Sequence, residues 1–191
     1  CWYSLNSGVA NTSITCGTNA TGLASAEGSN TWRVYANDSA GNQNSSSITF
    51  FKDTVNPLVT INSPAAQNYT QLIANISINE AGSCQYSLNS GVNNVTMTNN
   101  GNTNFNHTNS SIADGVYTLR AYCNDSLGNT NYTSSVGFQI DNTNPLISYG
   151  TGTESNNSFK SQTNVYVNVS VTEINEGTIT FRLYNSTGQV N

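Results

Sequence analysis

The sequence predicts an all-β protein built from tandem antiparallel β-sandwich repeats. Three observations support this fold class: a composition that favours strands over helices, an alternation of apolar and polar residues with a period of two, and a long internal repeat. Together they predict several short strands in each repeat, connected by turns rich in Gly, Asn and Asp.

Uncharged polar residues dominate the composition. Among 191 residues there are 33 Asn, 25 Ser and 24 Thr, whereas only 8% of the residues are charged. Asn and Ser side chains compete with the hydrogen bonds of a helical backbone, while Thr, Val, Ile and Tyr fit well in strands. The composition therefore favours a β protein whose surface is kept soluble by neutral polar groups.

The chain repeats itself at offsets of 83 to 88 residues. Two turn-bearing segments and one junction motif each occur twice. The matching pairs are Cys1–Val9 with Cys84–Val92, Arg33–Asn42 with Arg120–Asn129, and Asp53–Leu58 with Asp141–Leu146. Because the offset drifts slowly, the copies differ by small loop insertions and represent one structural unit.

A third copy begins after Pro145, because Val167–Glu173 matches Ala74–Glu80. The predicted domains are a partial repeat (its C-terminal part) at 1–57, a complete repeat at 58–145 and a partial repeat (its N-terminal part) at 146–191. The chain thus starts and stops inside a repeat. We expect either a polypeptide that continues on both sides, or neighbouring chains that complete each other's sandwiches by strand addition.

Within each copy, apolar side chains alternate with polar ones. The sets that share one face of a strand are Leu72, Ala74, Ile76 and Ile78; Tyr117, Leu119, Ala121 and Cys123; Val136, Phe138 and Ile140; and Val165, Val167, Val169 and Val171. A period of two is typical of half-buried strands. Turn residues such as Asn89–Gly91 and Asn124–Gly128 separate these strands, as in an antiparallel sandwich.

The repeat resembles the bacterial and archaeal immunoglobulin-like repeats of cell-surface proteins. The resemblance is carried by Asp114–Tyr117, by Arg120–Asn129 with its Asp-x-x-Gly-Asn turn, and by the Pro-bearing junction Asp141–Pro145. It implies tandem immunoglobulin-like antiparallel β-sandwich domains, and it suits an archaeal source. Modules of this kind are spacers, adhesins and filament building blocks, so the resemblance specifies the fold more closely than the function.

The four cysteines are Cys1, Cys16, Cys84 and Cys123, and none forms the Cys-x-x-Cys pair of a zinc or thioredoxin-like site. Cys84 and Cys123 have core phases, and their strands are neighbours in an immunoglobulin-like fold, so we expect a bridge between them. The counterpart of Cys123 in the first copy is Ala36, which leaves Cys16 as the partner of Cys1. Buried free thiols are the alternative. Paired cysteines indicate an oxidising, extracellular environment.

The glycosylation sequon Asn-x-Ser/Thr recurs along the whole chain. Its asparagines are Asn11, Asn19, Asn37, Asn44, Asn68, Asn75, Asn94, Asn106, Asn109, Asn124, Asn131, Asn156, Asn168 and Asn185. Composition alone would supply more than half of these, but Asn75, Asn124 and Asn168 lie on the outward phase of their strands, where a glycan can be attached. We therefore expect dense N-glycosylation, which would compensate for the low surface charge and protect edge strands against aggregation.

The charge pattern argues against nucleic-acid binding. The net charge is −5, and only five Lys and Arg residues are present, so no basic patch can form. No apolar run approaches the roughly 18 residues of a membrane-spanning helix, and no signal peptide or initiator Met is present. We expect a mature product or a part of a longer protein.

The sequence offers no catalytic constellation. The only histidine, His107, is expected in an exposed polar loop, and every Ser/His/Asp or Cys/His nucleophilic site would need it. The acids are few and scattered, which argues against a paired-carboxylate hydrolase. They are Glu27, Asp38, Asp53, Glu80, Asp114, Asp125, Asp141, Glu154, Glu173 and Glu176. We therefore expect no enzymatic activity.

Asp53 and Asp141 lie at the junctions between copies, with Asp38 and Asp125 in neighbouring turns. Their oxygens would suit calcium, but the acids are not closely spaced along the chain. We favour a role in capping turns and strand ends. The prediction is accordingly no metal and no cofactor, with N-linked glycans as covalent modification.

Lys52 occupies an inward position that is Ile140 in the second copy. A lysine–asparagine isopeptide crosslink is conceivable there, but we favour a lysine whose amine reaches solvent at the edge of the domain.

Four aromatic residues are candidates for core or interface positions. Trp32 has the core phase of its strand, whereas Trp2 has the outward phase. Trp2 is thus either simply exposed or able to stack on a sugar or an adjoining subunit. Tyr35 and Tyr122 are the other aromatic residues expected at the surface.

The expected function is structural. Tandem copies, disulfides and a sugar-ready surface suggest a subunit or segment of an extracellular fibre, stalk or surface layer that self-associates. Two alternatives remain open: an adhesin module that binds carbohydrate or a cell surface through Trp2, Tyr35 and Tyr122, and a spacer of a larger secreted protein.

Overall fold

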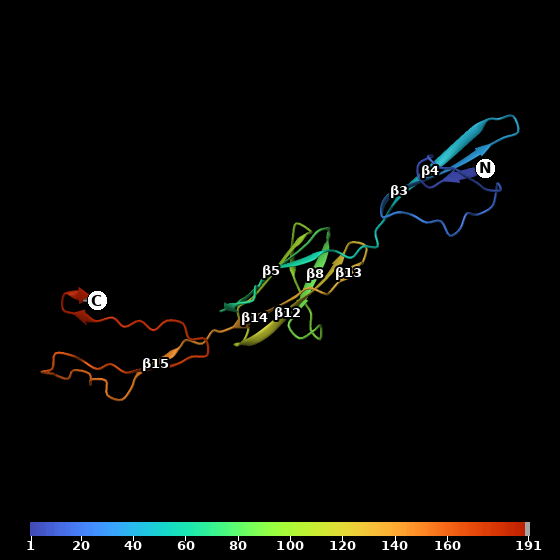
Figure 1. The fold of residues 1–191 in the computed structure, drawn as a ribbon. Helices are drawn as coiled ribbons and strands as arrows, with labels where there is room; N and C mark the ends of the chain where they lie inside the picture. Colours follow the sequence, from blue (N-terminus) through green and yellow to red (C-terminus); the bar gives the residue numbers. More distant parts are fainter. Residues whose placement is uncertain (190–191) are drawn as a thin grey trace.

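The computed structural model describes residues 1–189, and within that range it contains strands and turns but no helix. Three units follow one another along the chain and lie in a row, with the two termini at opposite ends (Figure 1). The all-β fold class predicted from the sequence is confirmed. Within the described range there is no helix long and apolar enough to cross a membrane.

The N-terminal unit is one four-stranded sheet with the order β2-β1-β3-β4. Its strands are β1 (Trp2–Ser4), β2 (Thr12–Ser13), β3 (Gly28–Asn37) and β4 (Gln43–Lys52). The register of β3 and β4 sets Trp32 opposite Ile48 and Asn30 opposite Phe50, so these side chains share one face. The rings of Trp32 and Phe50 meet edge to face at 5.0 Å on this face, where both residues are half-buried.

The middle unit is a sandwich of two sheets. One sheet has the order β10-β11-β7-β5; the other has the order β6-β14-β12-β8-β9, with β13 paired to β12. The strands are β5 (Val59–Ser63), β6 (Asn68–Tyr69), β7 (Leu72–Ile78), β8 (Gly82–Ser87), β9 (Val95–Thr96), β10 (Thr98–Asn100), β11 (Asn104–Asn109), β12 (Gly115–Asp125), β13 (Thr130–Asn131) and β14 (Ser135–Ile140). All pairs are antiparallel except β6 with β14.

The core lies between these two sheets and follows the alternation in the sequence. In β7 the side chains of Leu72, Ala74, Ile76 and Ile78 are buried, whereas the intervening ones, which include the apolar Ile73, are exposed or half-buried. The buried apolar residues are Val59, Leu72, Ala74, Ile76, Ile78, Cys84, Tyr86, Met97, Phe105, Ile112, Leu119, Ala121, Cys123, Phe138 and Ile140. Full burial of one large aliphatic side chain contributes about 1.5–3 kcal/mol. The middle unit therefore has a core of its own.

Two disulfides close the first two units. Cys84 faces Cys123 across the β8–β12 ladder, with a Cα–Cα distance of 4.2 Å. Cys1 is joined to Cys16, with a Cα–Cα distance of 5.2 Å. These are the pairs expected from the sequence, and neither zinc ligation nor free thiols apply to them.

The C-terminal unit contains β15 (Leu146–Tyr149), β16 (Val169–Thr172), β17 (Tyr184–Asn185) and β18 (Gly188–Gln189). The strand expected from the alternation of four valines is shorter than predicted, because only Val169 and Val171 belong to β16. Val165 and Val167 precede the strand and are 59% and 44% exposed. The equivalent strand β7 is held along its whole length by β5 and β11, whereas among residues 1–189 β16 pairs only with the four residues of β15.

Candidate functional site

The segment between the first and middle units is held to the unit that precedes it. Glu27, just before β3, accepts two hydrogen bonds from Thr54: one from its backbone N–H at 2.9 Å and one from its hydroxyl at 2.7 Å. The Lys52 amine lies 2.9 Å from the Glu27 carboxylate and also donates to the Ser25 carbonyl. The carboxylate therefore ties the start of the linker to its own unit, and the amine of Lys52 is occupied by this ion pair rather than placed for a crosslink.

The second junction uses the same arrangement. Asp114, just before β12, accepts the backbone N–H of Asn142 at 2.7 Å and the hydroxyl of Thr143. Asn142 also donates through its side chain to the Ile112 carbonyl. Each acid immediately precedes a glycine with positive φ, Gly28 or Gly115. The acid–glycine step is thus a recurrent device that fixes the linker to the repeat it leaves.

These hydrogen bonds shift the acidity of both carboxyl groups. The Lys52 hydrogen bond and the two bonds from Thr54 lower the pKa of Glu27 from 4.5 to about 2. The hydroxyl of Thr143 and the N–H of Asn142 likewise lower the pKa of Asp114. Both acids are therefore ionised at neutral pH, as acceptors of several hydrogen bonds should be.

The first linker is also bonded to the unit that follows it. The side-chain amide of Asn129 donates to the Asp53 carbonyl at 3.2 Å, and that of Asn131 donates to the Pro57 carbonyl at 2.8 Å. The backbone N–H of Leu58 donates to the Asn79 side chain at 2.7 Å. Since the linker is bonded on both sides, it couples the two units instead of acting as a free tether.

The Asp-x-x-Gly-Asn turn explains how Asn129 is positioned. Asp125 accepts hydrogen bonds from the backbone of Leu127 and Asn129 and from the Asn129 side chain. Gly128 supplies the positive φ of +94° that closes the turn. Burial acts to raise the pKa of Asp125, but the hydrogen bonds from Asn129 and its neighbours prevail and lower it. The turn therefore presents one remaining amide hydrogen of Asn129 to the linker.

Three acids meet at this junction. Asp53, Glu80 and Asp125 have carboxylate oxygens that all lie within 4.8 Å of one another. The expectation that the acids are scattered is wrong here, because folding brings together groups that are far apart in sequence. The pKa of Glu80 is raised by burial and by the charges of Asp53 and Asp125.

This cluster is not the set of acids that the sequence offers for calcium. Glu80 joins Asp53 and Asp125, whereas Asp38 caps its own turn. Carboxylate oxygens are suitable ligands for a hard cation. However, both oxygens of Asp125 already accept hydrogen bonds, so the cluster is first of all a set of like charges at a junction.

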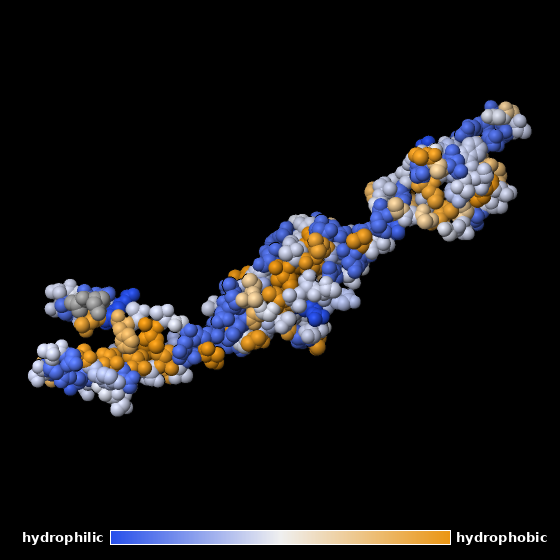
Figure 2. Space-filling model, in the orientation of Figure 1, coloured by the Kyte–Doolittle hydropathy of each residue, from blue (hydrophilic) through white to orange (hydrophobic). Residues whose placement is uncertain are grey.

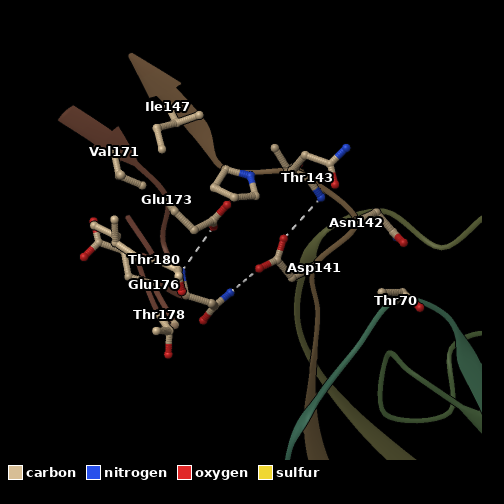
Figure 3. A pocket seen from close by; sticks show the side chains of 15 residues that line it. Thr70, Asp141, Asn142, Thr143, Ile147, Val171, Glu173, Glu176, Thr178 and Thr180 are labelled. Atoms are coloured by element: carbon tan, nitrogen blue, oxygen red, sulfur yellow. Dashed lines mark hydrogen bonds between the residues drawn. The ribbon is translucent and has the colours of Figure 1, made fainter. Parts of the chain in front are cut away.

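The second junction borders a pocket of about 450 Å³, shown in Figure 3. Asp141 lies between the linker and the C-terminal unit: it accepts the backbone N–H of Thr143 at 3.2 Å and the side-chain amide of Asn175 at 2.6 Å. Glu173 in turn accepts the backbone N–H of Asn175 at 3.2 Å. Asp141 and Glu173 thus repeat the positions of Asp53 and Glu80 at the other junction.

The sequon asparagines are all accessible in part or in full. Eight of the fourteen are exposed and six are half-buried, with none buried. Asn75 and Asn106 are neighbours on adjacent strands, and the amide of Asn75 donates to the oxygen of Asn106 at 2.5 Å. Asn131 differs from the others because it holds the linker. Accessibility meets the steric requirement for N-glycosylation, which stays a prediction.

The aromatic residues expected at the surface stack in pairs. Trp2 and Tyr35 lie opposite each other on β1 and β3, with ring centroids 5.4 Å apart and planes nearly parallel. Tyr122 stacks on Tyr132 at 6.4 Å. The hydroxyl of Tyr35 lies against Gly8, and that of Tyr122 lies against Gly91, each in the turn after a neighbouring strand. Packing on a turn is therefore a role that these tyrosines share.

His107 lies in β11 and not in the exposed polar loop expected from the sequence. It is half-buried, and its Nδ1 lies 3.0 Å from the hydroxyl of Tyr86. His107 is opposite Ala74 in the ladder with β7, so it points toward the core and meets the polar end of a buried tyrosine. The sequence is misleading at this point because the polar neighbours of His107 lie on the solvent side of a strand and do not form a loop.

The structure brings together groups that sequence reasoning missed. The sequence identifies Glu27 and Asp114 as acids and Asn131 as part of a sequon, whereas their bonds to the linkers appear only in the structure. The sequence does contain one indication of this role: an acid followed by Gly occurs in equivalent positions of the two copies, at Glu27 and at Asp114.

Residues 67–142 match the family described as bacterial Ig-like domain. The match lies within the middle unit, and the several antiparallel sheets of the chain are consistent with tandem Ig-like modules. The domain matched is a structural one, and there is no match to an enzymatic family.

No curated protein matches the chain. Among solved structures, it is similar to the crystal structure of an engineered protein, with 15% sequence identity and a TM-score of 0.37; the match covers 47% of this chain and 21% of that one. The chain thus corresponds to about a fifth of the engineered protein's length.

The Ig-like match and the two disulfides together bear on the class of protein to which the chain belongs. Disulfides persist in oxidising environments outside the cytoplasm. Two disulfides and a segment that matches the bacterial Ig-like domain together suggest a secreted or surface protein.

Proposed function

We propose that this chain is a structural segment or subunit of an extracellular, N-glycosylated fibre, stalk or surface layer. The observation that carries the proposal is the linker, which is bonded to the unit before it by Glu27 and to the unit after it by Asn129 and Asn131. A protein that only tethers other domains has no need for such bonds. A structural element that must keep its units aligned does need them, because they limit bending between units.

Two further observations support the proposal. The acid–glycine device recurs at the second junction with Asp114, so the attachment of the linker to the preceding unit is a property of the repeat. The fourteen sequon asparagines are spread over all three units, and none is buried. A surface covered with glycans in this way would protect exposed strand edges.

The proposal is tested by electron-microscope imaging of the native material, unreduced and with its sugars intact. We expect long filaments or arrays with a regular repeat and lateral density at the sequon positions. Isolated short rods or flexible beads would contradict the fibre and favour the alternatives, an adhesin or a spacer segment. In that case, glycan and cell binding by a Trp2, Tyr35 and Tyr122 triple alanine variant would separate the two.

A further inference from the structure

A row of side chains crosses the outer face of the middle unit, on the side of the sheet away from the core. Thr96 of β9 is opposite Gln85 of β8, and Gln85 is opposite Tyr122 of β12. Cys123, next to Tyr122, is buried in the core, so the ring of Tyr122 lies on the outer side of the strand. It stacks on Tyr132, which is 57% exposed. The row therefore ends in a pair of stacked rings at the surface.

A sequon lies at the other end of this row. Asn94 immediately precedes β9, and Thr96 is the hydroxyl residue of its sequon. Asn94 is exposed, and no described residue bonds to its side chain. Two other sequon asparagines lie nearby, Asn124 and Asn131, but their amide nitrogens donate to backbone carbonyls. Among these three, Asn94 is therefore the one whose amide nitrogen is free to carry a glycan.

A hollow of about 490 Å³ lies beside the row, and Gln85, Asn94, Thr96, Tyr122 and Tyr132 are among the residues that line it. Its size is within the range of about 300–1,000 Å³ that is usual for small-molecule sites. The amide of Gln85 donates to the hydroxyl of Thr96 at 3.2 Å, which leaves its oxygen as an acceptor. Hydrophilic and apolar side chains are intermixed on the side of the middle unit seen in Figure 2. A pyranose ring, with C–H groups on its faces and hydroxyls on its rim, suits such a mixture of aromatic and polar groups.

The first copy has the same arrangement. Asn11 is the sequon asparagine that immediately precedes β2, and it is exposed with no described residue bonded to its side chain. In the sheet, Ser13 is opposite Trp2, and Trp2 is opposite Tyr35. The rings of Trp2 and Tyr35 are stacked, with centroids 5.4 Å apart and planes 8° apart. A sequon, a row across three strands and a stacked aromatic pair thus occur together twice.

The two copies build the aromatic pair from different residues. The tyrosine of β3 or β12 is common to both, but its partner is Trp2 in the first copy and Tyr132 in the second. The counterparts of these partners are Gln85 and Ser45, which have no ring. Each copy therefore keeps one stacked pair although the position of the second ring changes. Since the rings lie outside the core, the pair serves something on the outer surface, next to the sequon that both copies share.

We infer that the N-glycans attached at Asn11 and Asn94 lie along the outer face of their sheets, with their first pyranose rings packed on Trp2–Tyr35 and on Tyr122–Tyr132. The inference rests on the N-glycosylation in the proposed function and deepens it. From β9 to β12 there are two strand spacings, about 10 Å, which the first sugars of a glycan span. Burial of the apolar faces of the sugars and of the aromatic rings drives the contact.

A glycan held in this way covers the edge of each sheet. The strands β2 and β9 are edge strands, and each directly follows its sequon asparagine. A glycan that lies flat over these strands blocks their pairing with other chains better than one that moves freely in solvent.

The test uses the 191-residue chain secreted from a host whose N-glycans begin with N-acetylglucosamine. Glycopeptide mass spectrometry should find both Asn11 and Asn94 occupied. A peptide N-glycosidase then acts on the folded chain, and the conversion of each asparagine to aspartate reports the rate of release at that site. Tyr132→Ala should speed release at Asn94 roughly two- to tenfold, because one stacked ring is lost, and should leave Asn11 unchanged. Trp2→Ala should have the reverse effect.

Each variant contains its own control, because the glycan of the other copy reports whether the chain is still folded. Tyr132→Phe keeps the ring and should release its glycan at the wild-type rate. The inference is overturned if Asn11 or Asn94 is unoccupied, if a variant leaves its own site unchanged, or if it speeds both sites equally. Empty sequons beside rings that bind added N-acetylglucosamine oligomers would also overturn it, and would assign the rings to the sugars of another molecule.

The outcome is separable from that of the proposed function. Protected glycans at Asn11 and Asn94, in a protein whose native material forms no fibre or layer, would refute the structural function alone. Regular native fibres in which both asparagines are unmodified would refute this inference alone.

Discussion

Glu27 shows how a single carboxylate fixes a linker. Substitution by Gln leaves one acceptor oxygen where Thr54 now uses two and removes the ion pair with Lys52. We expect Glu27→Gln to lower the melting temperature by a few degrees at pH 7, measured by thermal unfolding. Glu176→Gln removes the same charge at an exposed site and should have little effect.

The effect of Glu27→Gln should depend on pH in a defined direction. Because folding lowers the pKa of Glu27 from 4.5 to about 2, its contribution is fully present above about pH 4.5 and is lost as the pH falls toward 2. The two melting curves should therefore converge at low pH. A difference that stays constant down to pH 2 would show that the carboxylate is not the responsible group.

Glu80 should behave in the opposite way. Burial and the charges of Asp53 and Asp125 raise its pKa, so ionised Glu80 opposes folding at neutral pH, and this penalty disappears as the pH falls below the ordinary value of 4.5. We expect Glu80→Gln to raise the melting temperature at pH 7 and to lose this advantage in acid. The measurement is thermal unfolding in the presence of a chelator, so that no cation screens the three acids. A lower melting temperature at pH 7 would contradict the repulsion.

At the scale of the strand and turn, the two disulfides should differ in proportion to the loops that they close. Their sequence separations are 15 for Cys1–Cys16 and 39 for Cys84–Cys123. Loop-closure entropy then gives a stabilisation of about 3 kcal/mol for the shorter loop and about 4 kcal/mol for the longer one. Paired alanine variants, followed by denaturant unfolding of the whole chain, should show losses in this order. Equal losses, or a larger loss for the shorter loop, would contradict the loop-length account.

Gly91 illustrates a turn that depends on its neighbour across the sheet. Its φ is +93°, and a Cβ placed there would lie 2.6 Å from the hydroxyl of Tyr122. Gly101 also has a positive φ, of +79°, but has no heavy atom within 4 Å of such a Cβ. Both Gly→Ala substitutions should cost about 1–3 kcal/mol of backbone strain. Gly91→Ala should cost more in denaturant unfolding, because Tyr122 must also move; equal costs would show that this contact is unimportant.

At the scale of the whole molecule, the coupling between units is open to direct measurement. We expect the double variant Asn129→Ala, Asn131→Ala to bend more freely between its first and middle units, because both side-chain bonds to the linker are removed. Small-angle X-ray scattering should then report a broader distribution of maximum dimensions. The matched control is Asn42→Ala, Asn44→Ala: it changes the equivalent residues of the first copy, including the equivalent sequon, at a turn that binds no described linker. An identical distribution for both double variants would contradict the coupling.

The sequence alone allowed much of the fold to be predicted. The alternation in Leu72–Ile78 and Tyr117–Cys123 identified the buried faces, because strand side chains alternate strictly, and a core-facing strand records this in its residues. The cysteine pairs followed from strand phase and from the correlated replacement of Cys123 by Ala36. In both cases the side of the strand on which a residue lies can be read from its position in the local alternation.

Only the tertiary structure decided the junctions and the extent of the terminal strands. Asp53, Glu80 and Asp125 are distant in sequence and meet through sheet topology, and Glu27 reaches Thr54 only because β3 and β4 pair in one register. The short β16 was equally unpredictable, since Val165 carries the pattern of a strand but lacks neighbours to hold it. The alternation in a sequence determines which side of a strand is apolar. Whether that side is covered, and by what, depends on partners that lie elsewhere in space.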